Sequence, residues 1–289
     1  MSGLINLSND TALAPLSDVV RDVVRASEGA KAEIFVAGAF ARDLWLQFAH
    51  YMGPVRATAD IDCAVQCEDW EAFHRISAAL VASGFHAPST KRPHRFVHSG
   101  GTSVDLVPFG GIERRDRTIA WPPDGSHVMN LVGFAEAFRS TVTFRLPGDV
   151  EVPVASLAAL AMLKLLAWRD RRLVEPGKDA RDLHLILRTY FEAGNQERAF
   201  VEISELADRD DFDIEHAGAE LLGRDLGQQL SEELRAELIR TLEVESSPQG
   251  ELRLATEMHR NDAESARKLL AGFQSGLNAI HPIASRRGR

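Results

Sequence analysis

Residues 57–65 read ATADIDCAV, and this stretch decides how the chain is interpreted. Its apolar residues predict a buried strand, yet Asp60 and Asp62 interrupt it. Strand side chains alternate between faces, so these two carboxylates point to one side, roughly 7 Å apart, and Ile61 points to the other. Because such a pair repels and is costly to bury alone, it indicates either a solvated strand end or a bound divalent cation.

Three further features favour a site that handles phosphate. The apolar run EIFVAG predicts a strand that ends at Gly38 and leads into a helix from about Ala39, and a helix start of this kind suits a phosphate. The run SVDLVPF places Asp105 in mid-strand, where a shared metal site would supply a partner. The apolar helix AMLKLLAW carries Lys164, which meets either a nucleotide phosphate or a carboxylate in a simple ion pair.

The order of the predicted elements divides the chain into an α/β part and a helical part. Hairpins are expected where HRFVH and SVDLVPF flank two glycines, and where TVTFRL and VEVPV flank PGD. After Pro153 the pattern is helical, beginning with SLAALAMLKLLAW. We expect a flexible arm at 1–14, an α/β domain at 15–153, a helical domain at 154–280 and a basic tail at 281–289.

Composition predicts a cytoplasmic protein with reduced cysteines and no membrane association. The net charge of −9 argues against a dedicated nucleic-acid binder, although KRPHR at 91–95 and RDRR at 169–172 are local basic clusters. The sequence shows neither a long apolar span nor a secretory leader. Cys63 and Cys67 stand four residues apart, which is too far for a disulfide along one strand, and we expect them to fill the core.

Taken together, the strand before GAFARDL, the ADID strand and the VDLVPF strand resemble the nucleotidyltransferase superfamily that includes DNA polymerase beta. SLAALAMLKLLAWRDR followed by GKDARDLHLIL is similar to the AbiEii-type nucleotidyltransferases of abortive-infection and toxin–antitoxin systems. The resemblance covers about residues 30–190. It implies an α+β fold in which a nucleotidyltransferase-type mixed sheet is flanked by helices and followed by a helical C-terminal domain.

The resemblance also implies roles for the residues of the α/β part. Gly38 and Ala39 correspond to the family's glycine-plus-small-residue turn at the triphosphate, although the family often has serine or glycine in place of Ala39. Asp60 and Asp62 correspond to its metal-binding pair. Asp105 corresponds to the third carboxylate, which acts as a base or a metal ligand.

Further nucleotide-binding candidates follow from the same resemblance. Lys164 corresponds to a helical lysine that reaches a phosphate and shares in catalysis. Lys178, Asp179 and Asp182 correspond to the element that closes the site. Arg42 is expected either to orient the nucleotide or to pair with one of the two strand aspartates.

These roles imply an enzyme that uses Mg²⁺, or Mn²⁺ in its place, to transfer an NMP from an NTP to an RNA, protein or small-molecule acceptor. A toxin-like member of this group would have an antitoxin partner.

Two alternatives to this function stay open. One is a catalytically silent nucleotide-binding or partner-binding regulatory protein of the same fold, for which Ala39 is the best argument. The other is a glycosyltransferase, which would release a nucleoside diphosphate in place of pyrophosphate.

Overall fold

The computed structural model describes residues 3–53, 60–203 and 212–279. The chain divides into two compact units, residues 1–160 and 161–289. Within the described ranges, every strand belongs to the first unit, and the second unit is helical. None of the described helices is long and apolar enough to cross a membrane.

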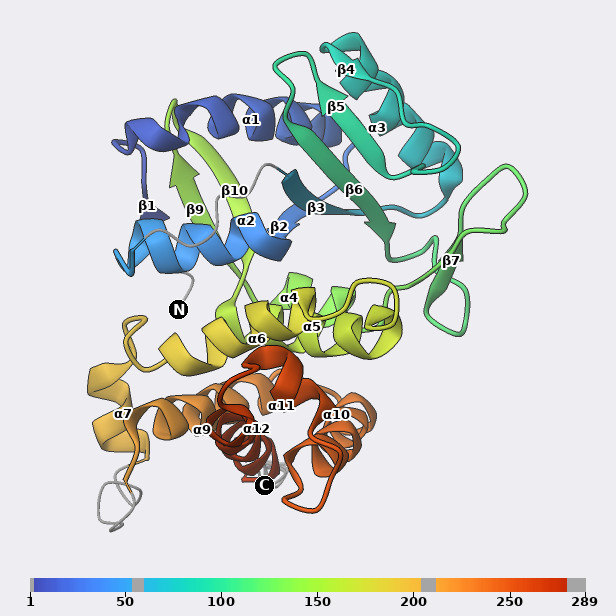
Figure 1. The fold of residues 1–289 in the computed structure, drawn as a ribbon. Helices are drawn as coiled ribbons and strands as arrows, with labels where there is room; N and C mark the ends of the chain where they lie inside the picture. Colours follow the sequence, from blue (N-terminus) through green and yellow to red (C-terminus); the bar gives the residue numbers. More distant parts are fainter. Residues whose placement is uncertain (1–2, 54–59, 204–211, 280–289) are drawn as a thin grey trace, which may run out of the picture. The chain divides into compact units, whose positions relative to one another are not determined.

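The first unit is built on an eight-stranded mixed sheet with the order β1-β9-β10-β2-β3-β6-β5-β4 (Figure 1). Three neighbouring pairs, β1/β9, β10/β2 and β3/β6, are parallel, and the other pairs are antiparallel. The strands are β1 (Leu4–Asn6), β2 (Ile34–Ala37), β3 (Asp60–Gln66), β4 (Phe85–His86), β5 (Arg95–His98), β6 (Ser103–Phe109), β9 (Thr141–Leu146) and β10 (Val150–Ala155). A separate ribbon pairs β7 (Thr118–Ala120) with β8 (Val128–Asn130). The mixed sheet of the predicted α+β fold is confirmed.

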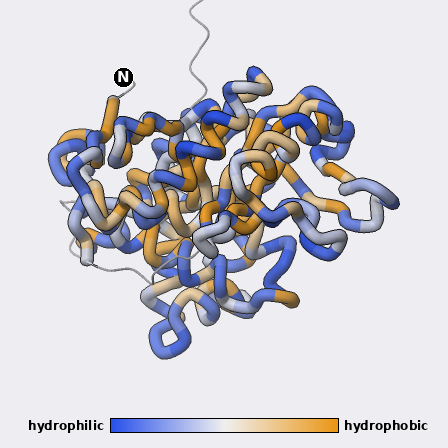
Figure 2. Tube along the Cα trace, turned by 90° about the horizontal axis from the view of Figure 1, so that it is seen from above, coloured by the Kyte–Doolittle hydropathy of each residue, from blue (hydrophilic) through white to orange (hydrophobic). Residues whose placement is uncertain are grey.

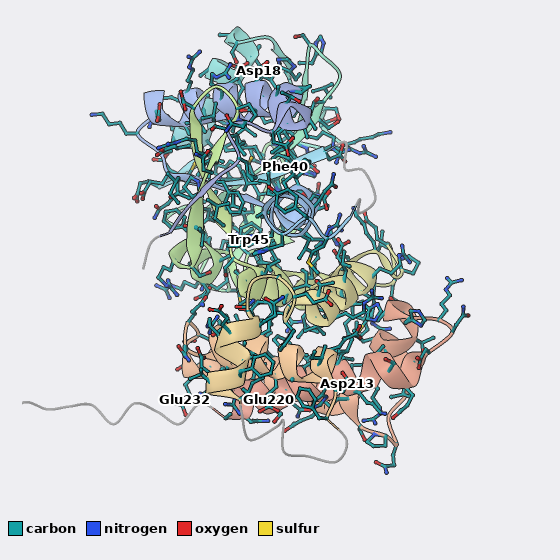
Figure 3. All side chains as sticks on the ribbon, turned by 90° about the vertical axis from the view of Figure 1, so that its left-hand side faces the viewer. Asp18, Phe40, Trp45, Asp213, Glu220 and Glu232 are labelled. Atoms are coloured by element: carbon teal, nitrogen blue, oxygen red, sulfur yellow. The ribbon has the colours of Figure 1, made fainter. Side chains whose placement is uncertain are left out.

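Helices cover this sheet. They are the 3₁₀ turn η1 (Thr11–Leu13), α1 (Ala14–Gly29), α2 (Gly38–Asp43), the π-helical turn η2 (Leu44–Ala49), α3 (Trp70–Ala82) and α4 (Phe134–Arg139). Apolar residues recur at helical spacing in α1, and Val19, Val20 and Val23 are buried. Two rings of α4, Phe134 and Phe138, contact Phe35 of β2. Phe40 on α2 and Trp45 on η2, both labelled in Figure 3, belong to the same unit, and Phe40 is buried.

The N-terminal segment differs from the loose arm expected at 1–14. Residues Leu4–Asn6 form the edge strand β1, which pairs in parallel with β9, and Leu7 and Leu13 are buried. A strand of three residues is too short to show an alternating pattern, so the sequence carried no signal for it. The tail expected at 281–289 lies outside the described residues.

The second unit is an assembly of helices. Helix α5 (Leu157–Arg171) runs from the end of the first unit into it, and is followed by α6 (Lys178–Thr189), α7 (Gln196–Glu202), α9 (Ile214–Gly227), α10 (Glu232–Ser246), α11 (Arg253–Met258) and α12 (Ala263–Asn278). Asp213, labelled in Figure 3, caps α9 by accepting a hydrogen bond from the His216 backbone N–H. Hydrophilic residues gather on the outlying loops and hydrophobic ones on the inner trace (Figure 2).

Glycine allows α9 and α12 to approach closely. A Cβ atom added at Gly276 of α12 would lie 2.0 Å from the carbonyl oxygen of Glu220 on α9. A Cβ added at Gly223 of α9 would lie 2.2 Å from the carbonyl oxygen of Phe273. No side chain fits between these backbones, so the two helices are held at backbone contact and form the centre of the second unit.

Candidate active site

The acidic residues of the first unit lie in one row across neighbouring strands. Asp62 on β3 stands opposite Ala37 on β2 and opposite Asp105 on β6. Asp60 precedes Asp62 by two residues and therefore shares its face of the sheet. Ile61, which points to the other face, is buried at 1% exposure. The sheet thus brings the three predicted carboxylates to one face of the first unit.

An arginine that the sequence analysis did not single out joins two of these acids. Arg95 begins β5 and stands opposite Asp105. Its Nε donates to Asp105 Oδ1 at 2.7 Å, and its Nη2 donates to Asp105 Oδ2 at 2.6 Å. The same Nη2 donates to Asp60 Oδ2 at 3.0 Å. The hydrogen bonds to Asp105 raise the pKa of Arg95 further, so the guanidinium is charged at every accessible pH.

His94, the neighbour of Arg95, does not supply a second positive charge here. Its Nε2 lies 4.0 Å from Asp105 Oδ1. Burial lowers the pKa of His94 below its ordinary value, which leaves the imidazole neutral at neutral pH. Arg95 is therefore the charged partner of Asp105 on this strand.

The turn into α2 lies directly against this acidic row. Gly38 has φ of +65°, in the left-handed region that L side chains rarely adopt. A Cβ atom built on Gly38 would lie 1.9 Å from Asp62 Oδ2, far inside van der Waals contact. Both the backbone conformation and the closeness to Asp62 therefore require glycine, and the turn holds the backbone of Gly38 beside the Asp62 carboxylate.

Replacing Gly38 by Ala should damage both stability and the acidic row. The left-handed backbone alone costs about 1–3 kcal/mol for a residue with a side chain. The added methyl group would also displace the Asp62 carboxylate, and we expect a further loss of about 100-fold in any activity that depends on Asp62. Urea unfolding and the activity assay described below measure the two effects.

Gly101→Ala is the matched control for this substitution. Gly101 also has a positive φ, +89°, but nothing lies within 4 Å of a Cβ added there. The Gly101→Ala variant should therefore lose stability from backbone strain alone and keep its activity. Equal activities in the two variants would contradict the requirement for a glycine at position 38.

The second unit contains a buried ion-pair cluster built from other predicted residues. Lys164 on α5 is 7% exposed, and its Nζ lies 3.1 Å from Asp179 Oδ1 and 2.6 Å from Asp182 Oδ2 on α6. Arg171 donates from Nε to Asp179 Oδ2 at 2.7 Å and from Nη2 to Oδ1 at 2.9 Å. Lys164 thus forms the ion pair with carboxylates that was one of the two expectations for it.

The charges in this cluster compensate for burial. Burial by itself would raise the pKa of Asp179, but the hydrogen bond from Arg171 and the charge of Lys164 hold the pKa below its ordinary value. Asp179 is therefore ionised at neutral pH. The cluster joins the apolar helix α5 to the first turn of α6 through charged side chains.

Two further candidates form ion pairs with residues near them in the sequence. Arg42 is buried, and its Nε and Nη2 donate to Asp43 Oδ1 at 2.9 and 2.6 Å. Lys178 is exposed and lies 3.2 Å from Glu175 Oε2. Arg42 therefore forms a local ion pair in the first unit, and Lys178 contributes a surface ion pair in the second.

The donor chemistry of the acidic row suits Mg²⁺, but the arrangement does not fit a bound ion. Across the described ranges, no group of three His, Cys, Asp or Glu side chains could hold a metal ion. Asp60 and Asp105, two of the three predicted ligands, are instead joined by the Arg95 guanidinium. The guanidinium of Arg95 thus lies where a divalent cation was expected.

The two cysteines take no part in this chemistry. Cys63 and Cys67 are free and buried, as predicted. Burial raises the pKa of the Cys63 thiol well above its ordinary value and that of Cys67 to about 12. Both thiols are therefore protonated and unreactive, and they serve as packing residues.

Sequence comparison assigns the chain to a class and a family. The family model described as "Nucleotidyl transferase AbiEii toxin, Type IV TA system" matches residues 28–272. By class, the protein is therefore a nucleotidyltransferase. It belongs to the AbiEii family of nucleotidyl transferase toxins of type IV toxin–antitoxin systems, which confirms the resemblance drawn from the motifs.

Two solved structures of one antibiotic-resistance factor show a distant similarity. The solution structure of ANT(2'')-Ia is 14% identical, with a TM-score of 0.38, and the match covers 67% of this chain and 95% of that one. The crystal structure of ANT(2'')-Ia in complex with adenylyl-2''-tobramycin is 15% identical, with a TM-score of 0.39 and coverage of 67% and 97%. No curated protein matches the chain. The family assignment rests on the family match alone.

Proposed function

We propose that the protein transfers a nucleoside monophosphate from an NTP to an acceptor and releases pyrophosphate, with Asp60, Asp62 and Asp105 as the catalytic carboxylates. The observation that carries this proposal is the row of acids in which Asp62 stands opposite Asp105 and against the Gly38 turn. Membership of a nucleotidyl transferase family supports the reaction type. A cluster of acids on one sheet face is a candidate functional site, because their repulsion favours binding of a cation there.

In this proposal each residue acts through charge or position. The backbone at Gly38 and Ala39 faces the triphosphate, because a left-handed glycine lets the chain approach a ligand closely. Once the Asp105 carboxylate is released from Arg95, it accepts the proton of the acceptor hydroxyl. If Mg²⁺ or Mn²⁺ is bound, Asp60, Asp62 and Asp105 would hold it, and it would supply charge neutralisation at the phosphates.

The second unit contributes the remaining candidates. Lys164, Asp179 and Asp182 form a buried charged cluster that holds the start of α6, and we propose that the neighbouring Lys178 offers its positive charge to a nucleotide phosphate. Lys178 is exposed and is therefore accessible to a ligand. We further propose that an antitoxin is the protein's genetic partner, because the family is described as part of a toxin–antitoxin system.

The reaction is tested by following both products. The full-length protein is incubated with each α-³²P-labelled NTP, Mg²⁺ or Mn²⁺, and separately with total RNA, a protein extract and a small-molecule extract. We expect label in one acceptor fraction together with an equal amount of pyrophosphate. The Asp60→Ala variant should give neither product.

Each alternative gives a different result in the same experiment. With a labelled nucleotide sugar supplied in place of the NTP, a glycosyltransferase would release a nucleoside diphosphate and no pyrophosphate. A catalytically silent nucleotide-binding protein would retain labelled NTP on a filter without transferring it. Either outcome, obtained with a folded protein, would overturn the proposed transfer.

A further inference from the structure

We propose that Arg95 is an intramolecular competitor of the divalent cation, and that a metal ion binds the acidic row only when the Arg95 guanidinium leaves Asp60 and Asp105. The inference rests on the proposed function, because it concerns the metal used by the same carboxylates. It follows from two observations that disagree. The carboxylates of the acidic row are ligands that suit Mg²⁺, but the Arg95 side chain already bridges two of them, Asp60 and Asp105.

The competition arises because the arginine and a metal ion would need the same oxygen atoms. Arg95 occupies both oxygens of Asp105, at 2.7 and 2.6 Å, and Oδ2 of Asp60, at 3.0 Å. Mg²⁺ binds carboxylate oxygens at about 2.0–2.1 Å and demands nearly octahedral geometry. A dication that close would also face the guanidinium charge at short range, so the two cations exclude each other.

The fold sets Arg95 in this position with little freedom. The β5–β6 hairpin places Arg95 directly opposite Asp105, and β6 pairs in parallel with β3, which carries Asp60 and Asp62. The guanidinium therefore faces the acids because of strand register. A planar fork with five N–H donors matches two carboxylates in a way that a lysine cannot.

The ion pair between Arg95 and the two acids is formed in this structure but is partly exposed to solvent. The side chain of Arg95 is 25% exposed, and that of Asp60 is 42% exposed. Lys91 and Arg92, on the loop that leads into β5, are exposed. A guanidinium at this depth can exchange its carboxylate partners for water, so its contact with the acids is a reversible one. Without a metal ion, Arg95 neutralises the repulsion between Asp60 and Asp105.

The direct test is Mn²⁺ binding to the full-length protein without nucleotide, measured by electron paramagnetic resonance titration. Arg95→Gln removes the competing charge and leaves a shorter, neutral polar side chain. We expect its Mn²⁺ affinity to be about tenfold higher than that of the wild type, because an opposite charge at this distance changes the ionic equilibrium of a carboxylate by at least that factor.

Arg92→Gln is the matched control. It changes the net charge of the protein by the same amount, but Arg92 is exposed and lies in the loop before β5. Salt screens exposed charges over roughly 8 Å, so this variant should bind Mn²⁺ within about twofold of the wild type. Equal affinities for the wild type and Arg95→Gln, weaker binding by Arg95→Gln, or an equal gain in Arg92→Gln would overturn the proposal.

Thermal unfolding gives a second readout. Without metal, Arg95→Gln should melt at a lower temperature than the wild type because Asp60 and Asp105 then repel each other. Added Mn²⁺ should raise its melting temperature more than that of the wild type, because tighter binding stabilises the folded state more. An equal or smaller rise would count against the competition.

If Arg95→Gln does not fold, Arg95→Lys takes its place. Lysine keeps the charge but loses the fork, so its Mn²⁺ affinity should lie above that of the wild type. An Mn²⁺ affinity no higher than that of the wild type would overturn the proposal.

The label-transfer assay separates the competition by Arg95 from the proposed transfer reaction. Equal Mn²⁺ affinities with intact transfer would contradict only the role of Arg95. Tighter Mn²⁺ binding by Arg95→Gln without transfer by the wild type would contradict only the reaction.

Discussion

Replacing Asp62 by Asn is expected to reduce label transfer from NTP by about 1000-fold, the scale seen when a group that stabilises transition-state charge is removed. Asp62 is the middle acid of the row, opposite Asp105 on one side and Ala37 on the other. The Asn side chain has nearly the same shape as that of Asp, so the Gly38 turn and the strand register should be unchanged. Only the negative charge is lost.

Thermal unfolding of Asp62→Asn separates a loss of activity from a loss of folding. A variant that is inactive but still melts cooperatively well above the assay temperature would be folded in the assay. Its inactivity would then be attributable to the charge at the site and not to unfolding.

Asp18→Asn is the control for the loss of an aspartate charge. Asp18 lies on α1, is exposed, pairs with Arg21 at 2.6 Å and is labelled in Figure 3. Its replacement should leave transfer within about twofold of the wild type, since an exposed pair of this kind contributes little. Full transfer by Asp62→Asn, or an equal loss in Asp18→Asn, would refute the catalytic role of Asp62.

Lys164→Met should give the largest loss of stability, about 3–5 kcal/mol in the free energy of unfolding, the usual cost of breaking a buried ion pair. The substitution keeps an unbranched side chain of similar length but removes the charge between Asp179 and Asp182. Asp179 is 1% exposed and would keep only Arg171 as a positive partner. Urea unfolding measures the change.

The same cluster gives the sign of a pH dependence. The pKa of Asp179 is lowered in the folded protein, so the cluster stabilises it above the ordinary aspartate pKa of about 3.9. That stability is lost as the pH falls through the lowered value. In Lys164→Met the lowering should be smaller, so the loss of stability on acidification should be smaller and should be complete at a higher pH.

Lys178→Met is the control for removing a lysine from the same helical unit. Lys178 is exposed and pairs only loosely with Glu175, so its loss should cost less than about 1 kcal/mol. In a double-mutant cycle with Asp182→Asn, the double variant should lose less stability than the sum of the two single losses, because both substitutions break the same ion pair. A cost for Lys164→Met no larger than that for Lys178→Met would contradict the ion-pair account.

Much of the sheet was predictable because alternation and turn residues act locally. The strand that ends at Gly38 and the two hairpins followed from apolar runs flanked by glycine or PGD, and all three are present. Asp60 and Asp62 could be placed on one face from strand geometry alone. The closeness of Gly38 to Asp62 could not, because it depends on β2 pairing with β3 across more than 20 residues of chain.

The partner of Asp105 was the most informative omission. The hairpin between β5 and β6 turns at about Gly100, so residues whose numbers add to 200 stand opposite each other, and Arg95 opposes Asp105. The hairpin was predictable from the sequence, and its register was enough to place Arg95 opposite Asp105. The edge strand β1, by contrast, forms through a long-range pairing with β9 that no local pattern in its three residues predicts.

The most direct measurement is anomalous diffraction from crystals grown with Mn²⁺ and a non-hydrolysable NTP analogue. The account predicts a manganese peak bonded to Asp60, Asp62 and Asp105, the nucleotide phosphates beside Gly38, and the Arg95 guanidinium withdrawn from the two acids that it bridges here. A bound nucleotide with manganese elsewhere, and with Arg95 still bridging Asp60 and Asp105, would contradict it.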